Sequence, residues 1–358
     1  MTATVDLEAG PTTEEFLGKV LGDTSGTTIT VLATIGDKLG LFKELAARGP
    51  ATSNELATRS HIDERYAREW LAGMTTAGYL SHDPATGQFE LPAAHVPVLA
   101  QEGGPEFFGG VHQMLSGMVA VQDRLVDAFR HGGGVPQSAY GDDLWDGIDR
   151  FTAGWFENLF LQDWLPRMPE VTALLERGAR VADVGCGRGR ALLKLASVYP
   201  TGTYVGYDVF APTIDRATAT AAAAQVSDRV RFEARDVSKG LPETYDVITT
   251  FDVVHDAADP LGMLTAIREA LRPGGRYVCL DINCTPDLAG NAGPLGSFFY
   301  GASLLYCMTT SLAAGGEGLG TLGLHPHKLD ELCAKAGFAS VRLVEMDNPF
   351  NNLYVATP

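Results

Sequence analysis

Apolar residues recur at helical spacing in the first part of the chain. Over residues 27–42 the apolar positions are three or four residues apart, which predicts an amphipathic or buried helix. Thr52 followed by Glu55 forms a capping box that starts a second, short helix. Asp63 caps a third helix that Gly78 ends. The expected inner face of this third helix comprises Tyr66, Trp70, Leu71 and Met74.

A small hairpin follows these helices. Two short extended runs, 79–82 and 88–91, flank the turn-rich loop 83–87. Helices followed by a hairpin predict a winged helix within residues 1–100. The third helix of such a domain can enter the major groove of DNA, but here it carries two arginines among three acids. We therefore expect a dimerisation and substrate-lid domain, with a transcription regulator as the alternative.

The pattern changes twice further along the chain. Residues 101–166 are helical and rich in aromatic residues, with an interruption at glycines 132–134, and are expected to form a linker and pocket wall. Residues 167–358 alternate between strands and helices, which predicts an α/β Rossmann-like sheet of seven strands. The expected strands are 180–184, 203–207, 229–233, 245–251, 275–282, 340–345 and 353–357.

Composition narrows the classes of protein that fit. The 358 residues are more than one core usually holds, which favours two folding units. The 44 acidic and 27 basic residues give a net charge of -17, which opposes binding to nucleic acid. Five cysteines without a CxxC pair indicate free thiols in a reducing compartment. Residues 1–11 contain no apolar run, so no secretory signal is expected and the protein is predicted to be cytoplasmic.

One long segment, residues 288–316, has no charged residue. Its glycines and a proline interrupt any spanning helix, so it is not expected to cross a membrane. Two interpretations remain open, a lining for a lipophilic or aromatic substrate pocket and a dimer-interface helix. The apolar side chains concerned are Phe298, Phe299, Tyr300, Leu304, Leu305, Tyr306 and Met308.

A glycine-rich turn, 183–189, follows the first strand of the α/β region and leads directly into a helix. Its sequence Asp-Val-Gly-Cys-Gly-Arg-Gly lets the backbone turn tightly and approach a ligand closely. Such a turn indicates nucleotide binding, although alone it is a weak signal. Its spacing is GxGxG and not the GxGxxG of dinucleotide sites, which disfavours NAD.

Two aspartates add to this signal. Asp208 ends the second strand, about 20 residues past the loop, where a carboxylate can accept hydrogen bonds from ribose hydroxyls. Asp236 follows the third strand and could accept a hydrogen bond from an adenine amino group, while Val237 covers the ring. Each aspartate alone could be an ordinary loop residue. Together with the glycine loop they form an adenosine-binding set.

From about residue 165 to the end, these motifs resemble class I S-adenosylmethionine-dependent methyltransferases. The resemblance also includes the strand at 245–248 and the turn at 271–275. The front end is similar to mycobacterial-type and small-molecule O-methyltransferases, which dimerise through a winged helix. The resemblance implies S-adenosyl-L-methionine as cofactor, a homodimer and methyl transfer to a hydrophobic small molecule, at oxygen in preference to nitrogen or carbon. The cofactor-site residues are then Asp183, Gly185, Gly187, Gly189, Asp208, Val209, Asp236, Val237 and Phe251.

The candidate general base is His255, just beyond the fourth strand. In plant-type O-methyltransferases a similar His-Asp segment supplies the base, and His255, Asp256 and Asp259 match it. Ala257 stands where those enzymes commonly have tryptophan. A neutral imidazole at pH 7 would suit the task. The alternative is a structural histidine that orients the cofactor or the next helix.

The sequence is not expected to contain a metal site. Asp252, Asp281 and Asn283 could hold Mg²⁺ as in catechol-type enzymes, but the His-Asp pattern is typical of the metal-free group. His325 and His327, with Cys307 upstream, lack a second spaced pair for zinc and are expected at a lid or helix entry. A different class of function stays open: a protein that binds the cofactor without methylating, as a sensor or a rearrangement enzyme.

Overall fold

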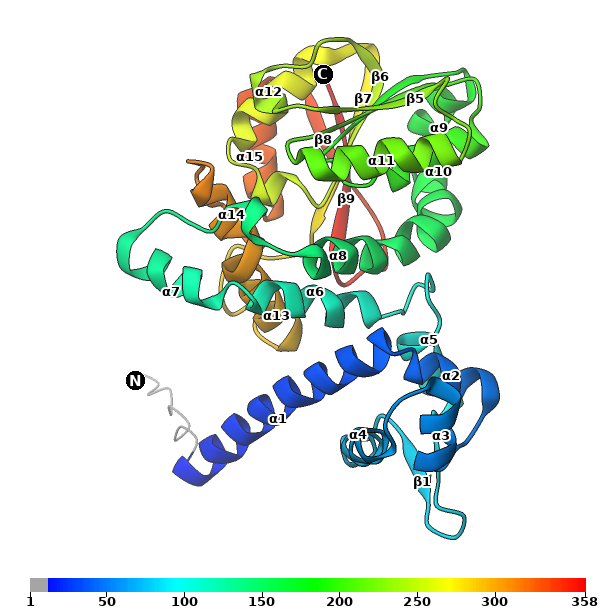
Figure 1. Cartoon of the computed structure of the whole chain (residues 1–358). Helices are drawn as coiled ribbons and strands as arrows, with labels where there is room; N and C mark the ends of the chain where they lie inside the picture. The colour runs from blue at the N-terminus through cyan, green and yellow to red at the C-terminus, as the bar shows by residue number, and fades with distance from the viewer. Residues whose placement is uncertain (1–11) are drawn as a thin grey trace, which may run out of the picture. The chain divides into compact units, whose positions relative to one another are not determined.

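A computed structural model of the chain describes residues 12–358. The expected absence of a secretory signal concerns residues 1–11, which lie outside the described residues. The described chain forms two compact units, residues 12–116 and 117–358 (Figure 1). No helix within residues 12–358 has both the length and the apolar character needed to cross a membrane.

The first unit consists of short helices and a two-stranded hairpin. The capping box predicted at Thr52 and Glu55 is present, and the Asp63 side chain caps the next helix by accepting from the backbone amide of Arg65. An isolated bridge between Ala51 and Phe89 adds to the hairpin. The elements are α1 (Thr13–Lys38), α2 (Leu41–Arg48), α3 (Ser53–Ser60), α4 (Glu64–Thr76), β1 (Ser81–Asp83), β2 (Gln88–Glu90), η1 (Ala93–His95) and α5 (Val96–Leu99).

Two expectations about this unit are corrected. Helix α1 begins well before residue 27, because Thr12 and Glu15 form a capping box of their own. Tyr66 is 78% exposed, although it was placed on the inner face of α4. The buried residues of α4 are instead Ala67, Trp70, Leu71 and Met74. These lie three or four residues apart, so the neighbouring Tyr66, about 100° away from Ala67 around the helix, falls outside the buried stripe.

Helices and helical turns precede the sheet in the second unit, and α6 (Gly109–Val119) spans the division between the units. The predicted aromatic helical region is present, but it is divided and its last part is a π-helical segment, η3. The elements are α7 (Gln122–His131), η2 (Gln137–Ala139), α8 (Asp142–Trp155), η3 (Phe156–Trp164), η4 (Leu165–Arg167) and α9 (Pro169–Glu176).

A seven-stranded sheet forms the centre of the second unit, as predicted. Its order is β5-β4-β3-β6-β7-β9-β8, and β9 is antiparallel to both of its neighbours. The strands are β3 (Arg180–Val184), β4 (Thr203–Asp208), β5 (Val230–Ala234), β6 (Tyr245–Phe251), β7 (Leu271–Ile282), β8 (Ser340–Val344) and β9 (Asn351–Thr357). The turn expected at 271–275 lies inside β7: Leu271 pairs with Tyr245 and Arg276 with Val247, so the residues between bulge out.

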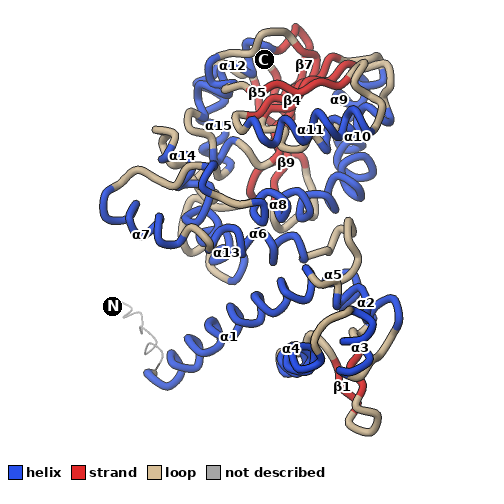
Figure 2. The backbone as a smooth tube through the Cα atoms, viewed as in Figure 1, coloured by secondary structure: helices blue, strands red, loops and turns tan. Residues whose placement is uncertain are grey.

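Helices cover both faces of this sheet (Figure 2). Alternate residues of a strand enter opposite cores: Val247 packs with α9 and α10, whereas Ile248 packs with α12 and α15. The remaining elements are α10 (Arg190–Val198), α11 (Ala211–Ala223), η5 (Val237–Lys239), η6 (Val254–Asp256), α12 (Pro260–Ala270), α13 (Pro294–Ala302), η7 (Ser303–Cys307), α14 (Met308–Ala313) and α15 (Pro326–Ala336). From β3 the strand order runs to β4 and β5 on one side and to β6 and β7 on the other. Ligands of open α/β sheets bind at such a switch point, at the carboxyl ends of the strands.

Candidate active site

A cavity of about 560 Å³ lies at the carboxyl ends of β3, β4 and β6. Eight of the residues assigned to the cofactor site from sequence line it: Asp183, Gly185, Gly187, Asp208, Val209, Asp236, Val237 and Phe251. Within residues 12–358, Gly189 and His255 are not part of this lining, although Asp256 and Ala257, next to His255, are. The structure therefore brings most of the predicted set into one cavity.

The three glycines of the loop all have a left-handed backbone, with φ of +69° at Gly185, +50° at Gly187 and +76° at Gly189. A Cβ at Gly185 would lie 2.4 Å from Val253, and one at Gly189 would lie 2.2 Å from Phe232. A Cβ at Gly187 would meet nothing within 4 Å. Gly185 and Gly189 are thus needed for packing, whereas Gly187 keeps the backbone open toward the cavity.

Asp208 ties the end of β4 to the glycine loop. Its Oδ2 accepts a hydrogen bond from the amide of Gly187 at 3.0 Å, and its Oδ1 accepts from the amide of Phe210 at 2.9 Å. Burial raises the pKa of this carboxyl even though these amides act in the opposite direction. Each oxygen retains capacity to accept a further hydrogen bond from a ligand.

Asp183 is buried at the end of β3. Its Oδ1 accepts a hydrogen bond from the hydroxyl of Thr249 at 2.6 Å. Burial raises the pKa of Asp183 to about 7; the Thr249 hydroxyl opposes this rise and nearby Asp208 adds to it. A cationic ligand beside Asp183 would favour its ionised form.

Asp236 caps the helical turn η5. Its Oδ1 accepts from the amide of Ser238 at 3.1 Å and from the Ser238 hydroxyl at 2.6 Å, and its Oδ2 pairs with Lys239 at 3.0 Å. These contacts lower the pKa of Asp236. The carboxylate is therefore fixed at the cavity wall next to the buried Val237, and its contact with adenine stays a prediction.

His255 lies in η6, where its ring is buried against the end of β7. Its Nδ1 is 2.7 Å from Oδ1 of Asp281. Asp281 also accepts from the amides of Ile282 at 2.8 Å and Val254 at 3.2 Å. Burial opposes protonation of the ring, yet Asp281 and Cys307 raise the pKa of His255 well above its ordinary value. Asp281 thus favours the protonated ring, and the neutral imidazole that suits a general base at pH 7 stays a prediction.

Asp252 and Asp281 lie close together, with His255 and not Asn283 as the third member of their group. Asp252 has a φ of +56°, and its Oδ1 accepts from the Asn351 amide group at 2.6 Å. Burial and the charge of Asp281 raise the pKa of Asp252 to about 8. The Asn283 side chain contacts Asn352 and the Asn348 carbonyl, and it does not complete a set with the two aspartates.

Several cavity residues come from segments that the sequence motifs do not include. Helix α8 contributes Trp145, Asp149 and Thr152 to the lining. The ring of Trp145 stacks on Phe210 with centroids 4.6 Å apart. The aromatic residues of the region 101–166 indicated a pocket wall, and Trp145, Trp155 and Phe156 among them do line the cavity, whereas Asp149 and Thr152 were not identified.

Arginine side chains join α8 to the glycine loop and α10. Asp149 lies 2.9 Å from Arg190 and 3.5 Å from Arg188, and Arg188 also pairs with Asp146. Glu157 pairs with Arg190 at 3.8 Å. Sequence reasoning missed this network, because the alternating charges of α8 have the pattern of an ordinary solvated helix face.

The uncharged segment contributes to the cavity through fewer residues than expected. Of its apolar side chains, Tyr306 lines the cavity, while Phe299 is buried in a separate cluster with Ile282 and Cys284. Tyr300 and Leu304 are 43% and 36% exposed. Downstream, the side chain of His325 caps α15, in keeping with the expected helix-entry role.

Comparisons with known protein families match both parts of the chain. Residues 175–299 match the model of a methyltransferase domain, and residues 27–101 match the model of an Rv2258c-like winged HTH domain. The chain therefore contains a methyltransferase domain preceded by a winged-helix domain, which confirms the combination predicted from the sequence motifs.

Individual relatives support the same assignment. The ubiquinone biosynthesis O-methyltransferase of Cereibacter sphaeroides (strain ATCC 17029 / ATH 2.4.9) is 33% identical over 109 residues, which is 30% of this chain and 43% of that protein. The match thus spans less than half of this curated relative. Among solved structures, PigF with SAH has a TM-score of 0.72 at 21% identity, covering 97% of this chain and 100% of the other. The mitomycin 7-O-methyltransferase MmcR has a TM-score of 0.69 at 18% identity, covering 96% and 98%. These structures share the fold of the whole chain.

Proposed function

We propose that this protein is an S-adenosylmethionine-dependent methyltransferase that methylates an oxygen atom of a hydrophobic or aromatic small molecule. The observation that carries the proposal is the cavity lined by the glycine loop, Asp208 and Asp256, with His255, the residue before Asp256, hydrogen-bonded to Asp281. The methyltransferase domain match and the named O-methyltransferase relatives support the choice of reaction and of oxygen.

The residues present fit an adenosine-containing cation. Gly187 leaves space for close approach of a ligand to the backbone, because a Cβ added at this residue would meet nothing within 4 Å. Asp208 can accept from ribose hydroxyls, Asp236 and Val237 can bind the base, and Val209 and Phe251 add apolar contacts. Asp183, whose pKa is about 7, can supply a compensating negative charge.

When bound, S-adenosylmethionine supplies an electrophilic methyl group on a sulfonium. The protein then has to orient the acceptor oxygen, exclude water and remove the proton of the acceptor. His255 is the proposed base: Asp281 holds Nδ1, so Nε2, on the side of Asp256 and Cys307, is the nitrogen that would take that proton. The ring has to be deprotonated before it can act, and Asp281 then stabilises the proton that the ring receives.

The acceptor class follows from the cavity wall. Trp145, Tyr306 and Pro136 give one wall of the cavity flat apolar surfaces. Arg188 and Arg190 also line the cavity, but both are paired with aspartates of α8. Tyr306 also stands edge-on to Tyr140, with ring centroids 5.4 Å apart, which fixes its orientation. An aromatic or lipophilic acceptor carrying a hydroxyl group suits such a wall better than a charged one.

A homodimer in the cytoplasm is part of the proposal. Helix α1 exposes apolar side chains along its length, among them Phe16 at 56%, Leu17 at 66% and Leu21 at 68%. A second copy of the chain would bury these side chains. The five free, buried cysteines support a reducing compartment.

Two measurements test the proposal. Calorimetry with S-adenosylmethionine and S-adenosylhomocysteine should detect binding of both, and Asp208→Ala should weaken it at least about tenfold, since a charged hydrogen-bond acceptor is lost. Asp228→Ala is the matched control, because Asp228 is 72% exposed and lies away from the cavity. Absence of binding by the unmodified protein would overturn the proposal.

Transfer itself is measured with methyl-labelled cofactor and a panel of phenols and other hydroxylated lipophilic compounds. His255→Asn should reduce transfer about 100-fold or more while cofactor binding is retained. Binding without transfer to any acceptor would favour a cofactor sensor over an enzyme.

A further inference from the structure

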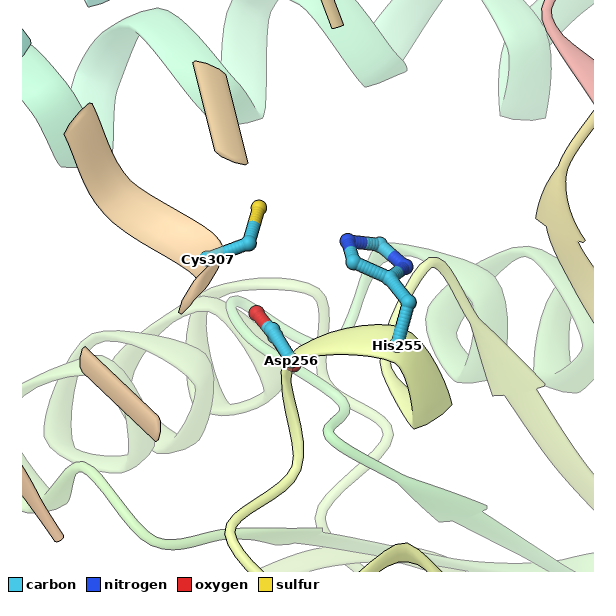
Figure 3. Close-up of side chains that lie close together, drawn as sticks. All are labelled: His255, Asp256 and Cys307. Carbon is cyan, nitrogen blue, oxygen red and sulfur yellow. The ribbon is translucent and has the colours of Figure 1, made fainter. Parts of the chain in front are cut away.

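Three different metal-binding side chains converge beside the cavity. A ring nitrogen of His255, a carboxylate oxygen of Asp256 and Sγ of Cys307 all lie within 4.8 Å of one another. Figure 3 shows that the first two come from η6 and the third from the helix of the uncharged segment, and that the three side chains point toward a common space. Residues about 50 positions apart in the chain thus form one cluster of nitrogen, oxygen and sulfur donors.

We propose that His255, Asp256 and Cys307 form a binding site for a divalent metal ion of the zinc class, and that the bound ion inhibits methyl transfer. Nitrogen and thiolate ligands together favour Zn²⁺ or Co²⁺ over Mg²⁺, which prefers oxygen ligands. The metal would occupy the same ring nitrogen that has to accept a proton from the substrate. Metal binding is independent of the proposed function, whereas the inhibition rests on it.

The surroundings of His255 have the arrangement found around metal-binding histidines. Such a histidine usually donates its second ring N–H to a carboxylate, which fixes the ring and the tautomer. Here Asp281 holds Nδ1 at 2.7 Å and is itself held by the backbone amides of Val254 and Ile282. Nε2 is therefore the nitrogen that faces Cys307 and Asp256.

Asp256 provides independent support. Asp256 lines the cavity and is partly buried, and across residues 12–358 no other side chain donates a hydrogen bond to its carboxyl group. A partly desolvated carboxylate without a donor is stabilised when a cation or a proton neutralises it. In the neighbouring trio of Asp252, His255 and Asp281, by comparison, Oδ1 of Asp252 accepts from Asn351 and both oxygens of Asp281 accept hydrogen bonds.

The size of the cluster suits three ligands with one open position. Zinc bonds of about 2.0–2.3 Å place tetrahedral ligand atoms roughly 3.3–3.8 Å apart. The ligand atoms lie within 4.8 Å of one another, so metal binding would require the Asp256 and Cys307 side chains to rotate toward the ion. A fourth position would then face the cavity, as in zinc sites that bind water or substrate.

The test uses Co²⁺ as a spectroscopic probe on the full-length protein, freed of metal by a chelator and kept reduced without added thiol. We expect a thiolate-to-cobalt charge-transfer band in the near ultraviolet that disappears when Zn²⁺ is added. Cys307→Ser should abolish the band, and Cys333→Ser, which changes a buried thiol of α15 outside the three-residue cluster, should retain it. Asp256→Asn and Asp281→Asn should weaken Co²⁺ binding about 10- to 100-fold, which keeps the test decisive should Cys307→Ser fail to fold.

Inhibition is measured separately as the Zn²⁺ concentration that halves methyl transfer in each variant. For each protein the rate is expressed relative to its own rate without metal. Cys307→Ser should need at least about tenfold more Zn²⁺ than the unmodified protein to lose half of that rate. Absence of the cobalt band in the unmodified protein, or its persistence in Cys307→Ser, would overturn the metal site. A band without inhibition would overturn the inhibitory role. Absence of methyl transfer under all conditions would contradict the proposed function, and the band would still decide whether the metal site exists.

Discussion

Nδ1 of His255 and Oδ1 of Asp281 are 2.7 Å apart, and both side chains are buried. Asp281 accepts two backbone amides as well as the ring, so it fixes the position of η6 together with that of His255. An asparagine at this position can accept only through one oxygen. Removing one acceptor should therefore affect the orientation and charge of the ring more than it affects the fold.

Asp281→Asn is expected to lower kcat for methyl transfer about 100-fold, because general-base catalysis contributes on this scale. KM for the cofactor should change less than about threefold, since Asp281 does not line the cavity that the cofactor would occupy. Steady-state kinetics separate the two, with circular dichroism confirming that the variant folds. An equal loss in cofactor affinity and kcat would contradict a positioning role.

The loop glycines provide a matched set of alanine substitutions. Gly187→Ala places a methyl group in open space and costs only the left-handed backbone, about 1–2 kcal/mol. Gly189→Ala adds a collision with Phe232 to the same backbone cost. We expect Gly189→Ala to lower the thermal midpoint further than Gly187→Ala, and Gly187→Ala to lose cofactor affinity out of proportion to its stability. Differential scanning calorimetry and binding titrations measure the two effects.

The sheet could be predicted from sequence because its strands are buried and its connections are short. Strands β3 and β6 were predicted with the bounds observed, since their apolar runs end in a glycine or an acidic residue. The extended start of β7 was not, because Pro273 and Gly274 are typical of turns and here form a bulge within a strand.

Contacts that depend on tertiary packing could not be predicted from the sequence. His255 and Asp281 are 26 residues apart and meet because β6 and β7 are neighbours. No spacing rule connects Cys307 with either of them, since its position depends on how the uncharged segment folds back. The motifs therefore indicated the part of the cavity proposed to bind the cofactor better than the part around His255.

Asp183 provides a pH-dependence test. Its pKa rises to about 7 on folding from an ordinary value near 4, so the folded protein binds this proton more tightly than the unfolded chain. The resulting stability is present below about pH 4 and is lost as the pH rises to 7. Between pH 5 and pH 8 the free energy of unfolding should therefore fall by on the order of 3 kcal/mol more in the unmodified protein than in Asp183→Asn.

Denaturant unfolding at several pH values measures this difference for Asp183. Asp252 and Asp256, whose pKa values are also raised, are present in both proteins and cancel in the comparison. Asparagine keeps the size of the side chain and can still accept from Thr249. Parallel pH profiles in the two proteins would show that Asp183 ionises normally.

The exposed apolar side chains of α1 predict dimer formation. Leu17→Glu combined with Leu21→Glu should convert the dimer into a monomer of 38.1 kDa, because charges on both residues oppose burial against a second copy. Tyr66→Glu, at a residue that is 78% exposed on α4, is the matched control and should leave the dimer intact. Sedimentation equilibrium distinguishes the outcomes, and a monomeric unmodified protein would contradict the proposed dimer.

The ion pairs of Asp149 hold α8 against the glycine loop and α10. Asp149→Asn removes the charge that pairs with Arg188 and Arg190, and Asp149 is only 19% exposed, so solvent screens these pairs less than surface pairs. We expect cofactor affinity to fall about three- to tenfold, because the α8 side of the cavity is held less firmly. Asp142 is on the same helix as Asp149, but it is 77% exposed, and Asp142→Asn removes its pair with Arg216. This control should change cofactor affinity less than about twofold.

Titrations at low and high salt provide the decisive comparison: salt should weaken cofactor binding more in the unmodified protein than in Asp149→Asn. Equal effects of the two substitutions would show that α8 is held by its apolar contacts instead.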